Sequence, residues 1–212
     1  MRPLRETLNP ESLRKIGIPK TMYNKSIDDF DTYGSSEYEK VKESVKDYLL
    51  NIDQMFIDNV GVTFYGANGV GKSFLASLII REAYRHRYSA YRLTFANYKD
   101  VYTASWNPDS GDNDNEFGVS AYTYKAAEFL CLEEIGKEID SKITTPILED
   151  LLRYREDKGL PIILCMNLRM SALEDKYGAS VASLIKGNTI PIKIEGEDKR
   201  GQYFKKRGFS ET

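Results

Sequence analysis

Residues 66–73 are the part of the chain whose types and spacing most directly predict a chemistry. They read Gly-Ala-Asn-Gly-Val-Gly-Lys-Ser and fit the pattern G-x-x-x-x-G-K-[ST] at every position. Glycines let the backbone fold around an anion with its N–H groups pointing inward, and a following helix directs the positive end of its dipole to the same phosphates. We expect Lys72 to reach the β- and γ-phosphates of a nucleotide and Ser73 to offer its hydroxyl to Mg2+. The alternative is a glycine-rich turn, which would not require lysine and serine in this order between a strand and a helix.

A second group of candidate residues follows an apolar run, Phe129-Leu130-Cys131-Leu132, which ends in Glu133 and Glu134. The run predicts a buried strand, and the two acids would then lie across from the phosphate loop. Glu133 is placed to bind Mg2+ directly or through water, and Glu134 to orient or deprotonate an attacking water. The alternative is a strand that runs into a solvated acidic turn. Glutamate stands where aspartate is usual, and its extra methylene makes the metal geometry slacker.

A polar amide ends the next apolar run. Residues 161–166 are continuously apolar, as in a strand buried on both faces, and Asn167 follows them. There it could sense a γ-phosphate or an attacking water. The alternative is an asparagine that caps a helix beginning near Ser171.

These residues need a scaffold of alternating strands and helices, and the hydrophobic periodicity predicts one. Expected strands are 61–65, 90–95, 127–132, 161–166 and 189–194. Expected helices are 36–56, from the phosphate loop to about 84, 97–106, about 145–158 and 173–186. Thr145 is the expected cap of the fourth helix, with Pro146 in its first position. The alternation predicts an α/β fold with a doubly wound, mainly parallel five-stranded sheet flanked by helices, which binds its ligand at the carboxyl ends of the strands.

Composition sets the broad class of the protein. The chain has 212 residues, enough for one α/β domain, and its 30 basic and 32 acidic side chains nearly cancel, so any polyanion site must be local. No apolar stretch is long enough for a membrane span, and residues 1–5 lack a signal-peptide core, so we expect a cytoplasmic protein without a membrane partner. Cys131 and Cys165 lie in apolar runs and are expected to be buried, reduced thiols. The single histidine, His86, is expected to be a solvated surface residue.

Other nucleotide-binding classes fit less well. Residues 133–136 resemble the D-x-x-G turn of GTPases, but glutamate stands first. Residues 24–28 resemble a guanine-reading N-K-x-D, but they contain one residue too many and precede the phosphate loop. A small-molecule kinase would need an arginine-rich lid, and no clear lid is present.

Taken in order, these segments resemble a known family. Residues 17–30 look like its lead-in, and residues 129–136 look like its metal strand and acidic pair. Residues 155–167 look like its passage from helix to strand to sensor, and residues 177–200 look like its C-terminal end. The family is the ATPase domain shared by the DnaC and DnaI bacterial helicase loaders and the IstB transposition ATPases, within the AAA+ class of P-loop NTPases. The resemblance covers roughly residues 16–201, and only the phosphate loop is highly specific alone.

The resemblance implies ATP bound with Mg2+ between neighbouring subunits, self-association into a ring or open spiral, and a grip on single-stranded DNA. It also implies the loading of a replicative DnaB-type hexameric helicase; the runner-up is an IstB-like helper of a DNA transposase. The nucleotide contacts would be Gly66, Ala67, Asn68, Gly69, Val70, Gly71, Lys72, Ser73, Phe74 and Arg200. The metal ligands would be Ser73 and Glu133, and the catalytic residues Glu134, Lys72 and Asn167. Arg200 could equally be a surface arginine.

The sequence departs from the family in two places. Where the family commonly has a serine-arginine pair whose arginine reaches a neighbour's γ-phosphate, this chain has Ser183 and Leu184, and Lys186 is the nearest cation. Lysine lacks the planar fork of arginine, so hydrolysis is expected to be slow. Cellular loaders also carry an N-terminal helicase-binding domain. Here we expect an extension at 1–34 that wraps onto the core or contacts a partner, a core at 35–196 and a basic tail at 197–212, as in a minimal loader of phage or mobile-element origin.

Candidate DNA contacts combine aromatic and cationic side chains, which suit single strands because rings stack bases while cations follow phosphates. They are Tyr98, Lys99, Tyr102 and Trp106 after the second strand, and Lys199, Arg200, Tyr203, Lys205, Lys206 and Arg207 in the tail. The alternatives are ordinary helix packing for the first group and a solvated chain end for the second.

Overall fold

The computed structural model describes residues 2–106, 117–137 and 142–199. The strands are β1 Gly61–Tyr65, β2 Ala90–Thr94, β3 Phe129–Ile135, β4 Ile162–Met166 and β5 Thr189–Lys193. The α-helices are α1 Pro10–Lys15, α2 Ser36–Leu50, α3 Ile52–Ile57, α4 Lys72–Arg85, α5 Phe95–Ala104, α6 Ala121–Ala126, α7 Thr144–Lys158 and α8 Leu173–Asn188. Short 3-10 turns are η1 Lys20–Met22, η2 Ile27–Asp29 and η4 Met170–Ala172.

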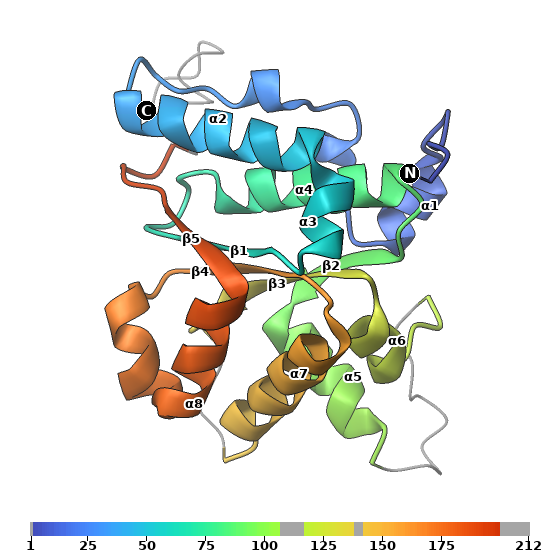
Figure 1. Ribbon diagram of the computed structural model, residues 1–212, viewed down its shortest axis with the longest axis vertical. Helices are drawn as coiled ribbons and strands as arrows, with labels where there is room; N and C mark the ends of the chain where they lie inside the picture. Colours follow the sequence, from blue (N-terminus) through green and yellow to red (C-terminus); the bar gives the residue numbers. More distant parts are fainter. Residues whose placement is uncertain (1, 107–116, 138–141, 200–212) are drawn as a thin grey trace, which may run out of the picture.

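Within the described residues, one five-stranded sheet has the order β2-β3-β4-β1-β5, and every neighbouring pair is parallel. β4 is central and buried along its whole length, as its continuous apolar run predicts. Helices cover both faces: Figure 1 shows α2 and α4 on one face and α7 and α8 on the other. The expected doubly wound α/β fold is confirmed, and the sheet is wholly parallel.

The sheet has a hydrophobic core on each face because side chains alternate along the strands. Phe129 and Cys131 of β3 point to the core that contains α2 and α4. Leu130 and Leu132 point to the core that contains α7 and α8. The same alternation brings Cys165 of β4 to the face of Cys131.

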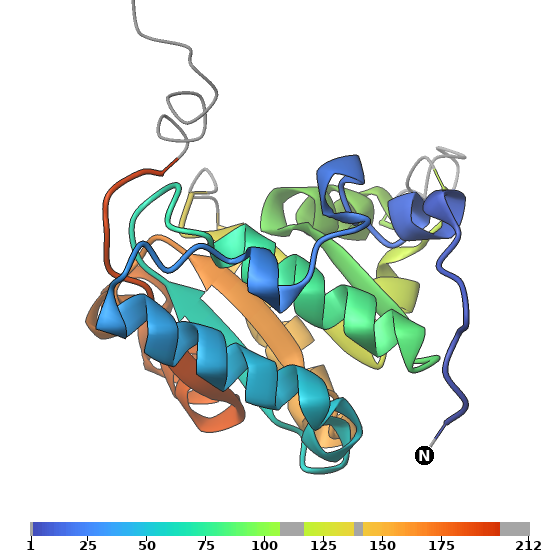
Figure 2. The ribbon, with the colours of Figure 1, turned by 90° about the horizontal axis from the view of Figure 1, so that it is seen from above.

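The N-terminal segment packs against this framework. Its apolar side chains Leu13, Ile16, Ile18, Met22 and Phe30 are buried in the core on the α4 face. Figure 2 shows the segment passing over α4 before α2 begins. It also covers the free edge of β2, where the amide of Arg92 donates to the carbonyl of Ile16 (2.9 Å).

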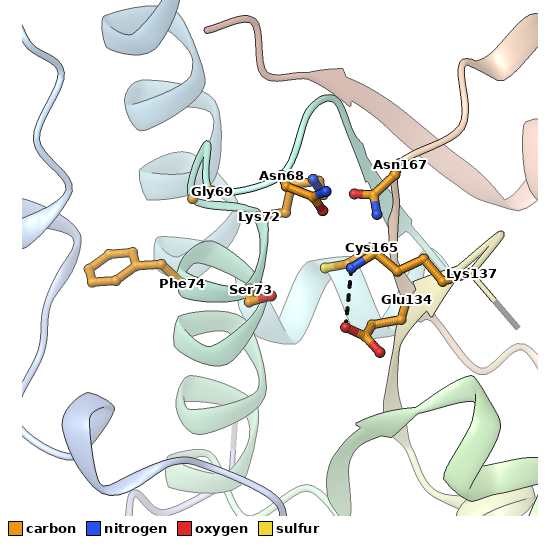
Figure 3. Close-up of a pocket in the computed structure, with 10 residues that line it drawn as sticks. Asn68, Gly69, Lys72, Ser73, Phe74, Glu134, Lys137, Cys165 and Asn167 are labelled. Carbon is orange, nitrogen blue, oxygen red and sulfur yellow. Dashed lines mark hydrogen bonds and ion pairs between the residues drawn. The ribbon is translucent and has the colours of Figure 1, made fainter. Parts of the chain in front are cut away.

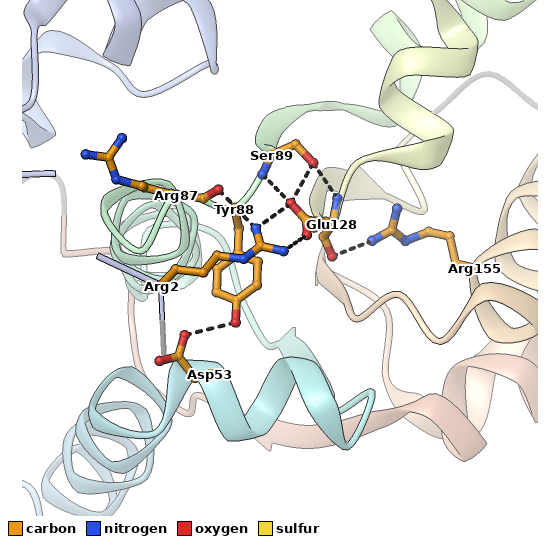
Figure 4. A network of polar contacts seen from close by, with 7 residues as sticks. All are labelled: Arg2, Asp53, Arg87, Tyr88, Ser89, Glu128 and Arg155. Atoms are coloured by element: carbon orange, nitrogen blue, oxygen red, sulfur yellow. Dashed lines mark hydrogen bonds and ion pairs between the residues drawn. The ribbon is translucent and has the colours of Figure 1, made fainter. Parts of the chain in front are cut away.

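A polar network fixes the start of the chain (Figure 4). Arg2 donates to the carboxylate of Glu128 and to the carbonyl of Arg87, and its guanidinium lies 4.3 Å from the centre of the Tyr88 ring. The Tyr88 hydroxyl donates to Asp53, and Glu128 also accepts from Ser89. The first residues are therefore tied to the loops before β2 and β3.

Arg155 of α7 is a fully buried cation that joins three segments. Its guanidinium donates to the carbonyls of Lys125, Ala127, Glu128 and Pro161, at 2.6–3.4 Å. It thereby connects α7 to the turn before β3 and to the start of β4.

Several expected boundaries were wrong. The helix expected over 36–56 is broken at Asn51, which lies outside helical geometry (φ −111°, ψ 26°) and separates α2 from α3. The fourth helix begins at Thr144, so Thr145 is not its cap. β3 extends beyond the predicted Leu132 to Ile135 and thus includes both acids.

The expectation that His86 is a solvated surface residue was also wrong. Its ring nitrogens lie 3.2 Å from Asp53 and 3.3 Å from Glu82.

Candidate functional site

The phosphate loop connects β1 to α4 and adopts backbone angles that favour glycine. Gly66, Gly69 and Gly71 have φ values of 147°, 72° and 106°. A side chain at Gly66 would also meet the backbone carbonyl of Ile194, because an ideal Cβ there lies 2.2 Å from that oxygen. Gly71 precedes α4 directly. α4 therefore begins at the loop, which puts the positive end of its dipole there, as anion binding favours.

Lys72 is the first residue of α4 and is only 8% exposed. Its ammonium donates to the carbonyls of Gly66 (2.8 Å) and Ala67. Those bonds hold a positive charge at the floor of the loop. Ser73, the next residue, is exposed.

Residues at the ends of β3 and β4 form the opposite wall of a pocket of about 190 Å³. Glu134, Lys137, Cys165 and Asn167 line it together with the phosphate loop, Ser73 and Phe74 (Figure 3). The sequence therefore identified three catalytic candidates, Lys72, Glu134 and Asn167, that the structure brings to one pocket. Lys137 and Cys165 were not foreseen as pocket residues.

Glu134 has an unusual backbone conformation. Its φ is 61°, in the left-handed region that non-glycine residues seldom adopt. Glu134 lies at the point of the sheet where the register between β3 and β4 shifts, between Leu132 and Ile135. The irregularity turns the Glu134 side chain out of the sheet and into the pocket. There its carboxylate accepts from the Lys137 ammonium at 3.3 Å. Such strained residues cluster at functional sites, at a cost of about 1–3 kcal/mol each.

Glu133 lies differently from its predicted role. Its carboxylate is largely buried and pairs with Arg92 of β2, with Nη2–Oε2 at 2.6 Å and Nε–Oε1 at 3.2 Å. Arg92 also donates to the carbonyl of Gly17 in the N-terminal segment (2.8 Å). Glu133 does not line the pocket of Figure 3; it lies in a neighbouring cavity beside Arg92. Its binding of a metal stays a prediction, and it would require the carboxylate to turn from Arg92.

Two segments that are distant in the sequence contact the phosphate loop. Phe30 lies so close to Gly71 that a Cβ there would be 2.7 Å from its ring, and Phe30 packs on Phe74 with ring centroids 5.9 Å apart. The amide of Lys199 also donates to the carbonyl of Gly69 (3.2 Å). A second cavity, of about 280 Å³, lies here against Gly69–Gly71. Its aromatic lining consists of Phe30, Tyr33, Tyr38 and Phe74.

The remaining candidates fall into three groups. Arg200, Tyr203, Lys205, Lys206 and Arg207 lie outside the described residues. Tyr98 is fully buried (0% exposed) in the core beside α7, so its prediction as a DNA contact was wrong. Trp106 lies in the turn just after α5 and is 56% exposed, and Tyr102 of α5 packs against it at a centroid distance of 5.9 Å. Lys99 on α5 is half-buried.

In this chain a core residue occupies the position at which the family that the sequence resembles commonly has an arginine. Leu184 on α8 is only 7% exposed and packs in the core below the sheet. Ser183 and Lys186 are exposed on the same helix. An arginine at 184 would have to leave this packing to reach a neighbour.

In the part of the chain that the structure describes, no helix is both long and apolar enough to cross a membrane. No protein-family model matches the sequence, and no curated protein sequence matches it.

Solved structures do match the fold. A DnaC helicase loader superposes with a TM-score of 0.69 at 19% identity, covering 84% of this chain and 100% of that one. DnaI superposes with a TM-score of 0.68 at 18% identity, covering 89% and 99%. The replication initiator DnaA bound to AMPPCP and single-stranded DNA gives 0.68 at 18% identity, covering 92% of this chain and 58% of DnaA. At this level of identity the likeness shows the fold alone: the chain shares the α/β fold of these DnaC, DnaI and DnaA structures.

Proposed function

We propose that this protein binds and hydrolyses ATP with Mg2+ and uses that cycle to load a replicative hexameric helicase onto single-stranded DNA. The observation that carries the ATPase part is one pocket that joins the phosphate loop to Glu134 and Asn167. The loader part is supported by coverage, because the fold spans nearly the full DnaC and DnaI chains that it matches. A cytoplasmic location belongs to the same proposal.

The nucleotide would lie across the two cavities beside the phosphate loop. Its phosphates would be held by loop N–H groups and by Lys72, which would exchange the carbonyls of Gly66 and Ala67 for phosphate oxygens. The base would enter the neighbouring cavity and stack on Phe30 or Tyr33. Lys199, whose ammonium lies 4.6 Å from the centre of the Tyr33 ring, would close the far side.

The residues around the pocket suit a hard divalent cation. Ser73, Glu134, Asn68 and Asn167 line it with oxygen atoms, which Mg2+ prefers, and phosphates and water would complete the shell. Bound there, Mg2+ would neutralise charge on the phosphates. Ser73 would be the direct protein ligand, and Glu133 would join only after leaving Arg92.

Glu134 is the group best placed to activate water, because it combines an exposed carboxylate with a position on the wall facing Lys72. Lys137 pairs with this carboxylate at 3.3 Å on the protein surface, where ion pairs contribute only about 0–1 kcal/mol. The pair would therefore yield readily to an attacking water. Asn167 would hold that water or the γ-phosphate through its amide.

Hydrolysis is proposed to be slow because the expected trans-acting arginine is replaced by the buried Leu184. Such arginines raise kcat by about 10³–10⁵. ATP would then act mainly as an assembly signal between subunits. Trp106 and Tyr102 are the described aromatic side chains proposed to meet single-stranded DNA.

The first experiment separates binding from hydrolysis. Lys72→Ala should abolish binding of a fluorescent ATP analogue, whereas Glu134→Gln should bind it normally and lose most of its phosphate release. Lys158→Ala, at an exposed lysine at the end of α7, is the control for loss of a lysine, and it should retain binding. Undiminished hydrolysis by Glu134→Gln would remove Glu134 from the base role.

The second experiment tests the loader role. With ATP and Mg2+, the wild-type protein should self-associate and co-purify with a DnaB-type helicase from its source cell, and Lys72→Ala should do neither. Trp106→Ala should weaken binding to a fluorescent single strand while keeping ATP binding, because base stacking contributes about 1–3 kcal/mol per base. If neither helicase nor single-stranded DNA binds, the loader role is refuted. Binding to duplex DNA and a transposase would instead support an IstB-like helper.

A further inference from the structure

We propose that Cys131, Glu133 and Cys165 form a site for a thiophilic divalent cation of the zinc class, directly beneath the nucleotide pocket. One ligand atom from each residue, two sulfurs and a carboxylate oxygen, lies within 4.8 Å of the other two. All three residues are buried. The proposal does not depend on ATP binding, so it can be tested separately from the proposed function.

The sheet itself brings these ligands together. β3 and β4 are neighbouring parallel strands in which Cys131 is opposite Ile163, so Cys165 lies two residues farther along β4. Side chains two residues apart share a face of a strand, and both cysteines belong to the core on the α4 face. Glu133 follows Cys131 by two residues. The set is thus fixed by strand register and not by a loop.

The separations suit a four-coordinate ion after a small contraction. With Zn–S near 2.3 Å and Zn–O near 2.1 Å, tetrahedral geometry places two sulfurs about 3.8 Å apart and a sulfur and an oxygen about 3.6 Å apart. The longest separation possible here, 4.8 Å, needs a contraction of about 1 Å. Rotation of a cysteine or glutamate side chain can supply that shift without moving the strands.

The net charge of the three ligands and Arg92 also suits a divalent cation. Two thiolates and one carboxylate carry three negative charges, and Arg92, which is paired with Glu133 at 2.6 Å, carries one positive charge. A divalent cation makes the buried assembly neutral, and a neutral assembly costs least to keep out of water. Sulfur ligands favour Zn2+ or Cd2+ over Mg2+, which prefers oxygen.

An entry path exists through the nucleotide pocket. Cys165 lines that pocket beside Ser73, and Figure 3 shows its side chain reaching in from β4. The fourth coordination position would face this opening and hold water. Since Glu133 cannot serve both ions, an ion held by the cysteines would withhold it from Mg2+.

Cobalt is a suitable probe because Co2+ occupies zinc-type sites and its bonds to thiolate absorb in the near ultraviolet. Untagged, reduced, metal-free protein should bind one Co2+ per chain with this absorption, and added Zn2+ should remove the absorption. Cys131→Ala and Cys165→Ala should each weaken Co2+ binding at least tenfold and roughly halve the thiolate band. Glu133→Gln should weaken binding while keeping both thiolate bonds.

His86→Gln is the matched control, because a histidine ring is a type of side chain that binds Co2+ and His86 instead contacts Asp53 and Glu82, outside the proposed set. This variant should leave the thiolate band unchanged. Circular dichroism would show that each variant is folded, and Zn2+ should raise the melting temperature of the wild type but not of Cys165→Ala. Absence of a thiolate band at millimolar Co2+, or a band as strong in both cysteine variants as in the wild type, would overturn the proposal.

Discussion

Arg92→Met would test the ion pair that Arg92 forms with Glu133, beside the proposed nucleotide pocket. Methionine retains the apolar stem of arginine but removes the guanidinium that contacts Glu133 at 2.6 and 3.2 Å and Gly17 at 2.8 Å. The Glu133 carboxylate would then be buried without a partner. Removing one member of a buried pair costs about 3–5 kcal/mol.

The expected shift is large enough to measure by urea unfolding. With a slope of about 2 kcal/mol/M, Arg92→Met should lower the unfolding midpoint by about 1.5–2.5 M. The double variant Arg92→Met/Glu133→Gln removes the orphaned charge as well. It should therefore be about 1–3 kcal/mol more stable than the sum of the two single changes predicts.

The assay is far-ultraviolet circular dichroism in urea without nucleotide, with Arg85→Met as control. Arg85 makes a surface pair with Glu82 at 3.2 Å, so its loss should change the free energy of unfolding by less than about 0.5 kcal/mol. If the costs of the two single changes simply add in the double variant, Glu133 is not held by Arg92 in solution and the reasoning fails.

Three further changes test the framework by the same unfolding measurement. Arg155→Met should lower the free energy of unfolding by about 3 kcal/mol or more, because it leaves buried carbonyls unpaired. The control, Arg153→Met at an exposed position, should lower it by less than about 0.5 kcal/mol. Equal losses in the two variants would contradict the role of Arg155. Gly66→Ala should destabilise by more than about 1 kcal/mol because its Cβ meets the Ile194 carbonyl at 2.2 Å and its φ is 147°; an unchanged midpoint would refute this. Gly187→Ala should instead stabilise by about 0.4–1 kcal/mol, since its Cβ would meet nothing within 4 Å in α8, and a loss would show hidden strain there.

The main features of the fold and pocket could be predicted because they depend on local pattern. The phosphate loop and the buried run of residues 162–166 each specify their own conformation. Parallel topology then brings the residues at the strand ends, Glu134 and Asn167, to the same edge as the loop.

The features that could not be predicted from the sequence depend on contacts between distant segments. Arg92 meets Glu133 across a strand register that neither sequence segment encodes alone. Tyr98 and Trp106 lie on one predicted helix, and only the packing of α5 against the core decided that the first is buried and the second exposed. The break between α2 and α3 at Asn51 could not be predicted, because no proline or glycine lies there.

The position of β1 in the sheet has a consequence for synthesis of the protein. β1 pairs with β4 and β5, whose residues follow it by about 100 positions or more, so it leaves the ribosome long before either partner. At about 5–20 residues per second, the apolar Val62 and Phe64 wait for roughly 5–20 s without a neighbouring strand. The nascent chain is therefore most prone to aggregate through this strand, and it is where a chaperone would help most.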